Sequence, residues 1–285
     1  MHKFILGVDG GGSKCAATLF DLEGRALASS VAGPANVFND FSLASQSIIA
    51  AAIDIANNLN IKLSDCLLSA ACAGASIQQA QDAFSRWDHP FAGAFLISDV
   101  HGSCLAANAG KDCILLVVGT GSCLAKLKSN SLSTYGGHGF LLGDTGSGAW
   151  IGKELLTWYL HSVDGIEQDQ FLHKVITEYL HNQVEADVSA IIQTYGKATS
   201  TEFAKLAFIA FEQYDKSASA RRIIDTAMAY FSSLISIHGQ DLPLFLEGGL
   251  ASSVMPFLSR ELDTKILRAD TSAQYGAYLY AVSQS

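Results

Sequence analysis

Short apolar runs alternate with glycine-rich or polar turns along the first third of the chain, a pattern that predicts strands joined by turns. The expected strands near the N-terminus are Lys3–Val8, Cys15–Asp21 and Arg25–Val31. A helix is then predicted over Leu43–Leu59, where apolar residues recur at helical spacing. The elements expected next are, in order, a strand Cys66–Ala73, a helix Ile77–Trp87, a strand Ala94–Ser98 and a helix from Asp99 to Ala109.

The strand pattern restarts near residue 113 and later gives way to helices. Strands are predicted at Cys113–Val118, at Cys123–Leu127 and in a short run ending at Tyr135, before a glycine-dense loop over Gly136–Gly148. The helices expected afterwards are Ala149–His161, Asp169–Gln183, Ser200–Tyr214, Ala220–His238, one near Ser253–Leu262 and a last one over Ser272–Val282. The repeated strand–turn–strand order indicates an internal duplication, with domains at 1–109 and 110–285.

Two glycine turns follow apolar strands in matching contexts. The first is the run Asp9–Lys14, and the second is Gly119–Ser122. Glycine lets another group approach the backbone closely, and its N–H groups can cradle phosphate oxygens. Neither turn has the spacing of a Walker A loop. Two such turns predict related halves that close on a phosphate chain, and therefore a nucleotide-using enzyme or switch.

Composition narrows the possible partners. Among 285 residues, 49% are hydrophobic, and the net charge of −9 disfavours nucleic acid or an anionic membrane as the main partner. No apolar run has the length of a membrane span, and Asp9 comes too early for a signal peptide, so we expect a cytoplasmic protein. The cysteines show no CxxC spacing and are expected to be buried reduced thiols; they are Cys15, Cys66, Cys72, Cys104, Cys113 and Cys123.

A third glycine pair, Gly248-Gly249, follows a predicted strand and completes an ordered set of motifs. That order resembles the actin, Hsp70 and sugar kinase superfamily. More closely, the chain resembles the N-acetylglucosamine and glucosamine kinase branch of the BadF/BadG/BcrA/BcrD ATPase family. The closer resemblance rests on Gly7–Lys14, Gly33–Asn36, Ser98-Asp99, Gly119–Ser122, Gly136–Gly139 and Gly143–Trp150. It implies an α/β fold of two ribonuclease-H-like domains with a nucleotide cleft between them, and a C-terminal helix 272–282 packed back on the first domain.

The resemblance implies binding of ATP and Mg²⁺. Asp9 suits Mg²⁺, usually through water, because this ion prefers hard oxygen ligands. The residues expected to bind ATP are Gly10, Gly11, Gly12, Ser13, Lys14, Gly119, Thr120, Gly121, Gly248 and Gly249, with Ala204 packed on the adenine. For Asp9 and for each glycine turn, a plain turn-forming role is the alternative.

The resemblance also implies a sugar site in which Asp99 is the catalytic base. A carboxylate that accepts the hydroxyl proton orients and activates that hydroxyl. The residues expected to contact the sugar are Asn36, Asp99, Ser122, Cys123, Gly137, His138, Gly139 and Asp144. His138 departs from the family, which often has an aromatic residue there. The structural alternatives are a helix N-cap for Asp99 and a turn former for Asn36.

The resulting hypothesis is an ATP-dependent kinase of N-acetylglucosamine or glucosamine, acting at the 6-hydroxyl, and by resemblance a homodimer. Three alternatives stay open. One is the ATPase activator of 2-hydroxyacyl-CoA dehydratases, which needs interface cysteines for an iron–sulfur cluster. Another is a non-catalytic, Hsp70-like ATP-gated binding module. The third is a glucokinase of the ROK type, although the zinc-binding Cys/His cluster of many such proteins is missing.

Overall fold

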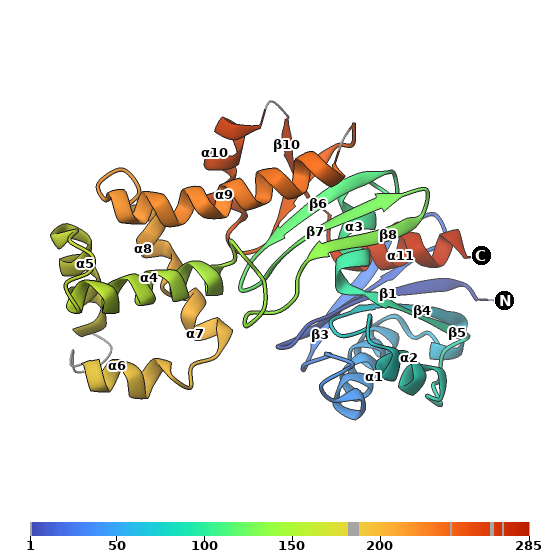
Figure 1. The fold of residues 1–285 in the computed structure, drawn as a ribbon. Coiled ribbons are helices and arrows are strands. Elements are labelled where there is room, and N and C mark those ends of the chain that lie inside the picture. The colour runs from blue at the N-terminus through green and yellow to red at the C-terminus, as the bar shows by residue number, and fades with distance from the viewer. Residues whose placement is uncertain (1, 182–187, 240, 263–264, 270, 285) are drawn as a thin grey trace. The chain divides into compact units, whose positions relative to one another are not determined.

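The computed structural model describes residues 2–181, 188–239, 241–262, 265–269 and 271–284 and contains two five-stranded sheets flanked by helices (Figure 1). The α/β class expected from the sequence is confirmed. Two compact units divide the chain. Unit 1 comprises Met1–Cys113, Ala125–Leu132 and Arg268–Ser285, and unit 2 comprises Ile114–Leu124 and Ser133–Leu267. Each unit is thus built from more than one stretch of chain.

The sheet of unit 1 has the order β3-β2-β1-β4-β5. Its strands are β1 (Phe4–Gly10), β2 (Cys15–Phe20), β3 (Ala26–Ala32), β4 (Cys66–Cys72) and β5 (Gly93–Ser98). The first three are antiparallel, whereas β1, β4 and β5 run parallel. In this register Gly10 lies opposite Cys72, which in turn lies opposite Ser98. The carboxyl ends of β1 and β5 therefore meet at one edge of the sheet, which carries Asp9 and Asp99.

Helices pack against the sheet of unit 1. They are α1 (Phe41–Leu59), α2 (Gln78–Ser85), α3 (Asp99–Ala107) and α11 (Ala273–Ser283), with a 3₁₀ turn at Leu63–Asp65. A helix over 43–59 and another over 272–282 were expected, and α1 and α11 occupy those places. Glycines bring α11 against α3, because a Cβ at Gly276 would overlap the Gly102 carbonyl. No side chain fits between the two backbones there.

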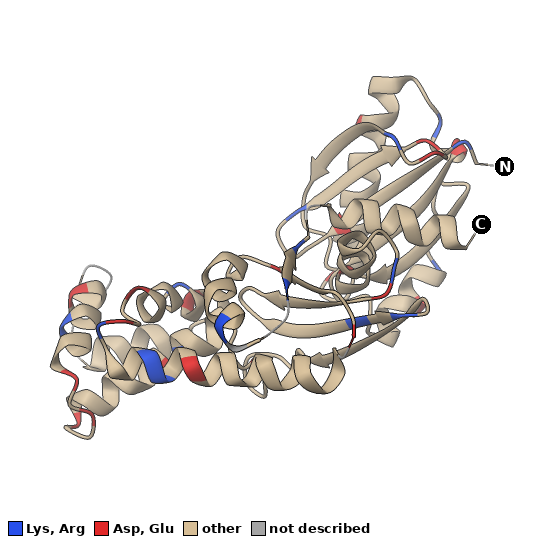
Figure 2. Ribbon diagram, turned by 90° about the horizontal axis from the view of Figure 1, so that it is seen from above, with Lys and Arg blue, Asp and Glu red and all other residues tan. Residues whose placement is uncertain are grey.

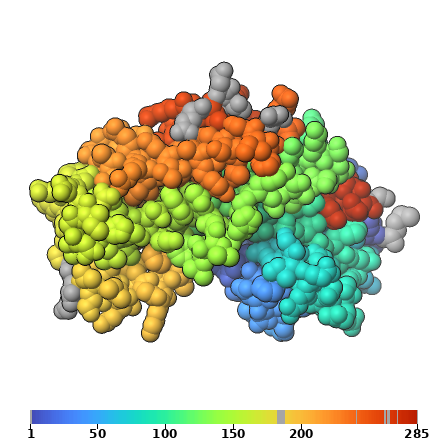
Figure 3. Space-filling model, viewed as in Figure 1, coloured from blue at the N-terminus to red at the C-terminus, as the bar shows by residue number. Residues whose placement is uncertain are grey.

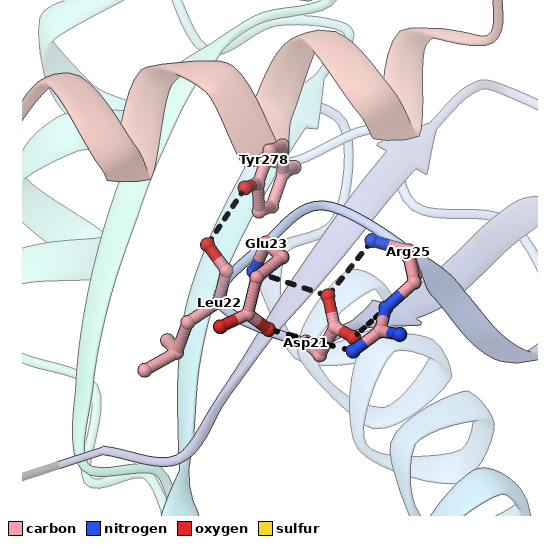
Figure 4. Close-up of polar contacts among 5 residues, drawn as sticks. All are labelled: Asp21, Leu22, Glu23, Arg25 and Tyr278. Atoms are coloured by element: carbon pink, nitrogen blue, oxygen red, sulfur yellow. Dashed lines mark hydrogen bonds and ion pairs between the residues drawn. The ribbon is translucent and has the colours of Figure 1, made fainter.

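The turn after β2 ties α11 to the sheet (Figure 4). Asp21 Oδ1 accepts hydrogen bonds from the Glu23 and Arg25 N–H groups, at 3.1 and 2.8 Å. Its Oδ2 pairs with Arg25 Nε at 2.6 Å. The Tyr278 hydroxyl donates to the Leu22 carbonyl oxygen at 3.2 Å. The C-terminal helix is therefore docked within unit 1.

The second sheet has the order β10-β9-β6-β7-β8. Its strands are β6 (Cys113–Val118), β7 (Ser122–Lys128), β8 (Ser131–Gly136), β9 (Leu244–Glu247) and β10 (Ile266–Arg268). The helices of unit 2 are α4 (Gly148–Val163), α5 (Gln170–His181), α6 (Val188–Tyr195), α7 (Ser200–Ala204), α8 (Ala207–Glu212), α9 (Ala218–His238) and α10 (Ala251–Glu261). Helix α9 runs as a continuous band over this unit (orange in Figure 3). It buries Ile224, Met228 and Phe231 in the core, as its apolar stripe predicts.

One expectation for unit 2 was wrong, two short elements were not predicted, and the end of one predicted helix is not described. The helix predicted over Ser200–Tyr214 is two short helices, α7 and α8, because the chain tightens where Leu206 N donates to Phe203 O at 2.9 Å. The short elements α6 and β10 were not expected, since each offers too few apolar repeats for a periodic signal. The predicted end of the Asp169–Gln183 helix, residues 182 and 183, lies outside the described residues.

Charged side chains are distributed over both helices and strands (Figure 2). In the part of the chain that the structure describes, no helix is long and apolar enough to cross a membrane. Five of the six cysteines are buried and Cys123 is partly buried, all as free thiols, as expected. Burial raises the pKa of Cys15 to about 12 and that of Cys66 to about 11. These two thiols are therefore protonated and unreactive at neutral pH.

Candidate active site

Two carboxylates lie at the carboxyl edge of the sheet in unit 1. Asp9 is the penultimate residue of β1, and Asp99 is the first residue of α3, directly after β5. Burial raises the pKa of both carboxyls, and the charge of Asp99 raises the pKa of Asp9 further, against the opposing effect of Lys14. The two groups therefore interact electrostatically, and each holds its proton more tightly than an exposed aspartate does.

The N-cap of α3 is Ser98, so the alternative role of Asp99 as helix cap is wrong. Ser98 Oγ accepts from the His101 N–H at 3.2 Å. Asp99 occupies the first helical position, and its Oδ1 accepts from the Val100 N–H at 2.9 Å. A capping residue and a carboxylate in the first turn both stabilise a helix N-terminus. Because Ser98 caps the helix, Asp99 Oδ2 is not needed for capping.

In the first glycine turn, the space beside the backbone is empty at Gly11 and Gly12, where packing within the protein does not require glycine. A Cβ at Gly10 would lie 2.5 Å from Cys72 Sγ, so packing within unit 1 requires that glycine. A Cβ at Gly12 would meet nothing within 4 Å, and one at Gly11 would meet only the Lys14 carbonyl oxygen at 3.7 Å. Neither glycine has a positive φ. These two positions leave space in which a ligand can approach the backbone.

Asn36 forms the turn that its residue type predicts. Its Oδ1 accepts from the Phe38 and Asn39 N–H groups at 3.1 and 3.0 Å. The turn is linked to the glycine loop, because the Ala35 N–H donates to the Gly11 carbonyl oxygen at 2.9 Å. The side-chain amide NH₂ makes no hydrogen bond to any residue in the described ranges. It is the part of Asn36 that can donate to a ligand.

In unit 2 a hollow of about 310 Å³ is lined by all four residues of the second glycine turn. It is lined by Val117, Gly119, Thr120, Gly121, Ser122, Cys123, Gly137 and Asp144. All of these except Val117 were expected at the nucleotide or sugar site. His138 does not line the hollow and its side chain is exposed, while Gly139 contacts Asp144 from the same loop.

Asp144 is the charged group of this hollow and is held in an unusual conformation. It has φ of 54° and is 9% exposed. Its Oδ1 accepts from the Gly139 N–H at 3.2 Å, and its Oδ2 would lie 2.9 Å from a Cβ at Gly121. Burial raises its pKa, against the lowering effects of the Gly139 N–H, His138 and the Ser122 N–H. The carboxylate is therefore held close to the Gly121 backbone, where a Cβ would meet its Oδ2.

Ser122, expected to contact the sugar, lines this hollow and also bonds within unit 2. Its hydroxyl donates to the Thr145 carbonyl oxygen at 3.0 Å, and the residue is 6% exposed. The hydroxyl thereby links β7 to the loop that carries Asp144. Its expected contact with the sugar stays a prediction.

The elements expected at the nucleotide meet around Gly148, the first residue of α4. A Cβ there would lie 3.1 Å from both Ala204 Cβ and the Gly119 carbonyl oxygen, and 3.2 Å from Leu250 Cδ1. The Gly148 N–H donates to Gly119 O at 2.8 Å. Gly248 has φ of 104°, and a Cβ there would overlap the Val118 carbonyl oxygen. A Cβ at Gly249 would meet nothing within 4 Å, so its backbone is open.

Sequence reasoning missed two residues of this region. Gly148 joins the three nucleotide-side elements, and Tyr230 of α9 approaches the sugar-side loop. The Tyr230 hydroxyl would lie 2.9 Å from a Cβ at Gly136, and burial together with the charge of Asp144 raises its pKa. The density of glycines around residue 148 was a usable signal. Nothing local marks Tyr230, which sits on a helix far along the chain.

The donors of unit 1 fit a Mg²⁺ ion that is completed by phosphate and water. Among the residues that the structure describes, no group of three or more His, Cys, Asp or Glu is placed to hold a metal by itself. Mg²⁺ in phosphoryl-transfer sites uses one or two carboxylates plus phosphate oxygens and keeps several waters. Asp9, beside the open glycine backbone, offers a hard oxygen donor of this kind, with Asp99 nearby.

Comparison with known proteins identifies the family. The model of the BadF/BadG/BcrA/BcrD ATPase family matches residues 6–281, and the chain belongs to this family. The fold, with its two five-stranded sheets, is shared with solved structures that are described as sugar kinases. The family and the fold that the motifs implied are therefore confirmed.

Two curated relatives match over nearly the whole chain. The glucosamine kinase GspK of Vibrio cholerae is 28% identical over 288 residues, which cover 98% of this chain and 96% of that protein. The N-acetylmuramic acid/N-acetylglucosamine kinase of Clostridium acetobutylicum is 25% identical over 306 residues, 99% of each chain. A solved structure from Chromobacterium violaceum, described provisionally as an N-acetylglucosamine kinase, matches with a TM-score of 0.85, 23% identity and 99% of each chain.

Proposed function

We propose that this protein transfers the γ-phosphoryl group of ATP to the 6-hydroxyl of an amino sugar, either glucosamine or N-acetylglucosamine. The two curated relatives are both named as sugar kinases. Use of ATP follows from membership of an ATPase family. The observation that carries the proposal is the placement of Asp99, a half-buried carboxylate at the edge that also bears Asp9 and an open glycine turn.

Asp99 is proposed to accept the proton of the sugar hydroxyl. Burial raises its pKa, so the ionised carboxylate is a stronger base than an exposed aspartate. The Val100 N–H holds one carboxylate oxygen, which leaves the other to receive the proton. Since a hydroxyl is a poor nucleophile, orientation and proton removal are the chief contributions that a side chain can make to phosphoryl transfer.

The nucleotide and metal are proposed to use the remaining elements. In unit 1 the open backbone at Gly11 and Gly12 suits phosphate oxygens, with Ser13 and Lys14 as side-chain donors and Asp9 as the ligand of Mg²⁺. Mg²⁺ would supply charge neutralisation on the phosphate oxygens. In unit 2 the proposed contacts are Gly119–Gly121 for phosphate, and Gly248-Gly249 with Ala204 for adenosine.

The sugar is proposed to bind through Asn36, Asp99 and Ser122 and through the loop of Asp144. Asp144 accepts hydrogen bonds from sugar hydroxyls, whereas the Asn36 amide donates to them. Cys123, Gly137, His138 and Gly139 complete the sugar-side set. The exposed imidazole of His138 is proposed to alter sugar preference. A homodimer and a cytoplasmic location belong to the same proposal, and light scattering after size-exclusion chromatography tests the first.

The test is release of ADP from Mg·ATP with a panel of sugars: glucosamine, N-acetylglucosamine, glucose, N-acetylmannosamine and no sugar. We expect release with one amino sugar above all others, and ³¹P–¹H coupling in the product at C6. ADP release equal with and without sugar would instead indicate an ATPase or a switch. The Asp99→Asn variant should lose turnover yet bind nucleotide, while Asp54→Asn, an exposed change on α1, should behave as wild type.

A further inference from the structure

The loop of residues 136–147, between β8 and α4, is held at both ends by α9. A Cβ at Gly136 would lie 2.9 Å from the Tyr230 hydroxyl, and a Cβ at Gly146 would lie 2.5 Å from Phe231 Cζ. Both glycines have positive φ, of 72° and 82°. The two ends of the loop are therefore clamped against adjacent residues of one helix, while the proposed sugar ligands lie between them.

The middle of this loop is attached through Phe140. Its ring centroid lies 5.1 Å from that of Phe203, and Lys153 Nζ lies 5.8 Å from the same ring. The next two residues do not share this contact, because Leu141 is 86% exposed and Leu142 is 89% exposed. Among the three consecutive apolar residues at the centre of the loop, Phe140 is thus the one that packs against the body of unit 2.

Phe203 leads directly to the nucleotide side of the same unit. It precedes Ala204 on α7, and a Cβ at Gly152 of α4 would overlap its carbonyl oxygen. Ala204 in turn lies against Gly148, which contacts the glycine turn at Gly119. A continuous line of packed residues therefore runs from Phe140 to the elements proposed to hold ATP.

We propose that Phe140 is a positioning residue that couples occupancy of the sugar site to the affinity for nucleotide. The inference rests on the proposed function. A sugar bound at Asp144 and Gly137 restricts the loop, and the contact between Phe140 and Phe203 passes that restriction to α7 and Ala204. Because binding coupling is reciprocal, bound nucleotide raises the affinity for sugar by the same factor.

The experiment measures the dissociation constant of a non-hydrolysable ATP analogue by calorimetry, with and without saturating amino sugar. In the wild type we expect the sugar to tighten nucleotide binding about fivefold or more. In Phe140→Ala this ratio should fall toward one, by about three- to fivefold, the size expected for loss of an aromatic pair and a cation–π contact. Nucleotide affinity without sugar should stay near the wild-type value.

Matched variants separate coupling from stability. Leu142→Ala removes a similar apolar side chain two residues away and should keep the wild-type ratio, because that side chain is exposed. Phe140→Tyr keeps the ring and should keep most of the coupling. Phe140→Leu serves as the second variant if the alanine form does not fold. Circular dichroism melting confirms that each variant is folded under the binding conditions.

The outcomes distinguish failure of the inference from failure of the proposed function. An active wild type whose ratio is unchanged in Phe140→Ala, or lost equally in Leu142→Ala, overturns the role of Phe140. A wild-type ratio of one overturns the coupling itself. A wild type that binds and phosphorylates no amino sugar overturns the proposed function, and the inference with it.

Discussion

The contact between α3 and α11 provides a test of how the fold positions Asp99. An alanine at position 276 would place its Cβ over the Gly102 carbonyl oxygen and 2.7 Å from the carbonyl carbon, with Ala106 N at 3.0 Å. All three atoms belong to backbone, so no side chain can rotate away. The two helices must separate by about 1 Å, and α3 begins with Asp99 only three residues before Gly102.

Two magnitudes follow for Gly276→Ala. Overpacking in a well-packed core costs about 1–3 kcal/mol, and replacing a helical glycine with alanine returns up to about 1 kcal/mol, so we expect a net loss of about 1–2 kcal/mol in the free energy of unfolding. A displacement of about 1 Å at a reacting group lowers turnover by about 100-fold. Affinity for nucleotide should change much less than kcat, because the first glycine turn is not in this contact.

The assay combines steady-state ADP release with chemical unfolding, and Gly93→Ala is the control. That glycine lies on β5, the strand that leads to Asp99, and its Cβ would meet Leu67 Cδ1 at 3.1 Å, the flexible end of a side chain. The control should therefore retain stability and turnover near the wild-type values. If Gly276→Ala keeps kcat within twofold of wild type, the packing of α3 on α11 does not set the geometry of Asp99.

Further predictions concern the carboxylates and the first glycine turn. Asp99→Asn should lower kcat by about 10²- to 10⁴-fold. In the wild type, kcat/KM should fall as pH drops through the raised pKa of Asp99, so the acidic limb of the pH profile should lie above the ordinary carboxyl value of 3.8. A flat profile down to pH 4 would contradict this. Burial raises the folded-state pKa of Asp9, so its ionised form costs stability once pH exceeds the unfolded value. Asp9→Asn should therefore raise the melting temperature at pH 7.5, with a gain that shrinks toward pH 4, and a lower melting temperature at pH 7.5 would refute the argument. Gly12→Ala should leave stability within about 0.5 kcal/mol but weaken ATP binding, because its Cβ meets no protein atom within 4 Å. Gly10→Ala should instead destabilise the fold through its contact with Cys72 Sγ at 2.5 Å, and equal melting temperatures for the two variants would contradict the packing argument.

Local patterns were sufficient for most of the strands and long helices. The apolar runs before Asp9 and Asp99 predict β1 and β5, and the structure has strands at those places. The stripe along α9 also predicts its buried face. Short elements escaped this reasoning, because α6 and β10 span too few residues to show a period. The break between α7 and α8 depends on packing rather than on a helix-breaking residue.

Some roles within the candidate site could likewise be predicted from the sequence, and others could not. Residue type beside a glycine turn was enough to single out Asp9, whereas Asp99 was singled out by the family resemblance. Only the strand pairing brings the two to one sheet edge. The choice of Ser98 over Asp99 as N-cap depends on rotamers and on the exact start of the helix, which propensity leaves open because both residue types cap well. The hydroxyl of Ser122, which links to Thr145 O, is likewise a contact that residue type alone does not specify.

The sequence by itself determined the order of strands and glycine turns and the family to which the chain belongs, because these depend on near neighbours and on motif order. Only the tertiary structure decided that Asp144 lies against Gly121, that Ala204 meets Gly119 across Gly148, and that Phe140 packs on Phe203. Each of these contacts joins residues from separate elements. Their distances are set by how whole helices and strands pack, and no local period of the sequence carries that information.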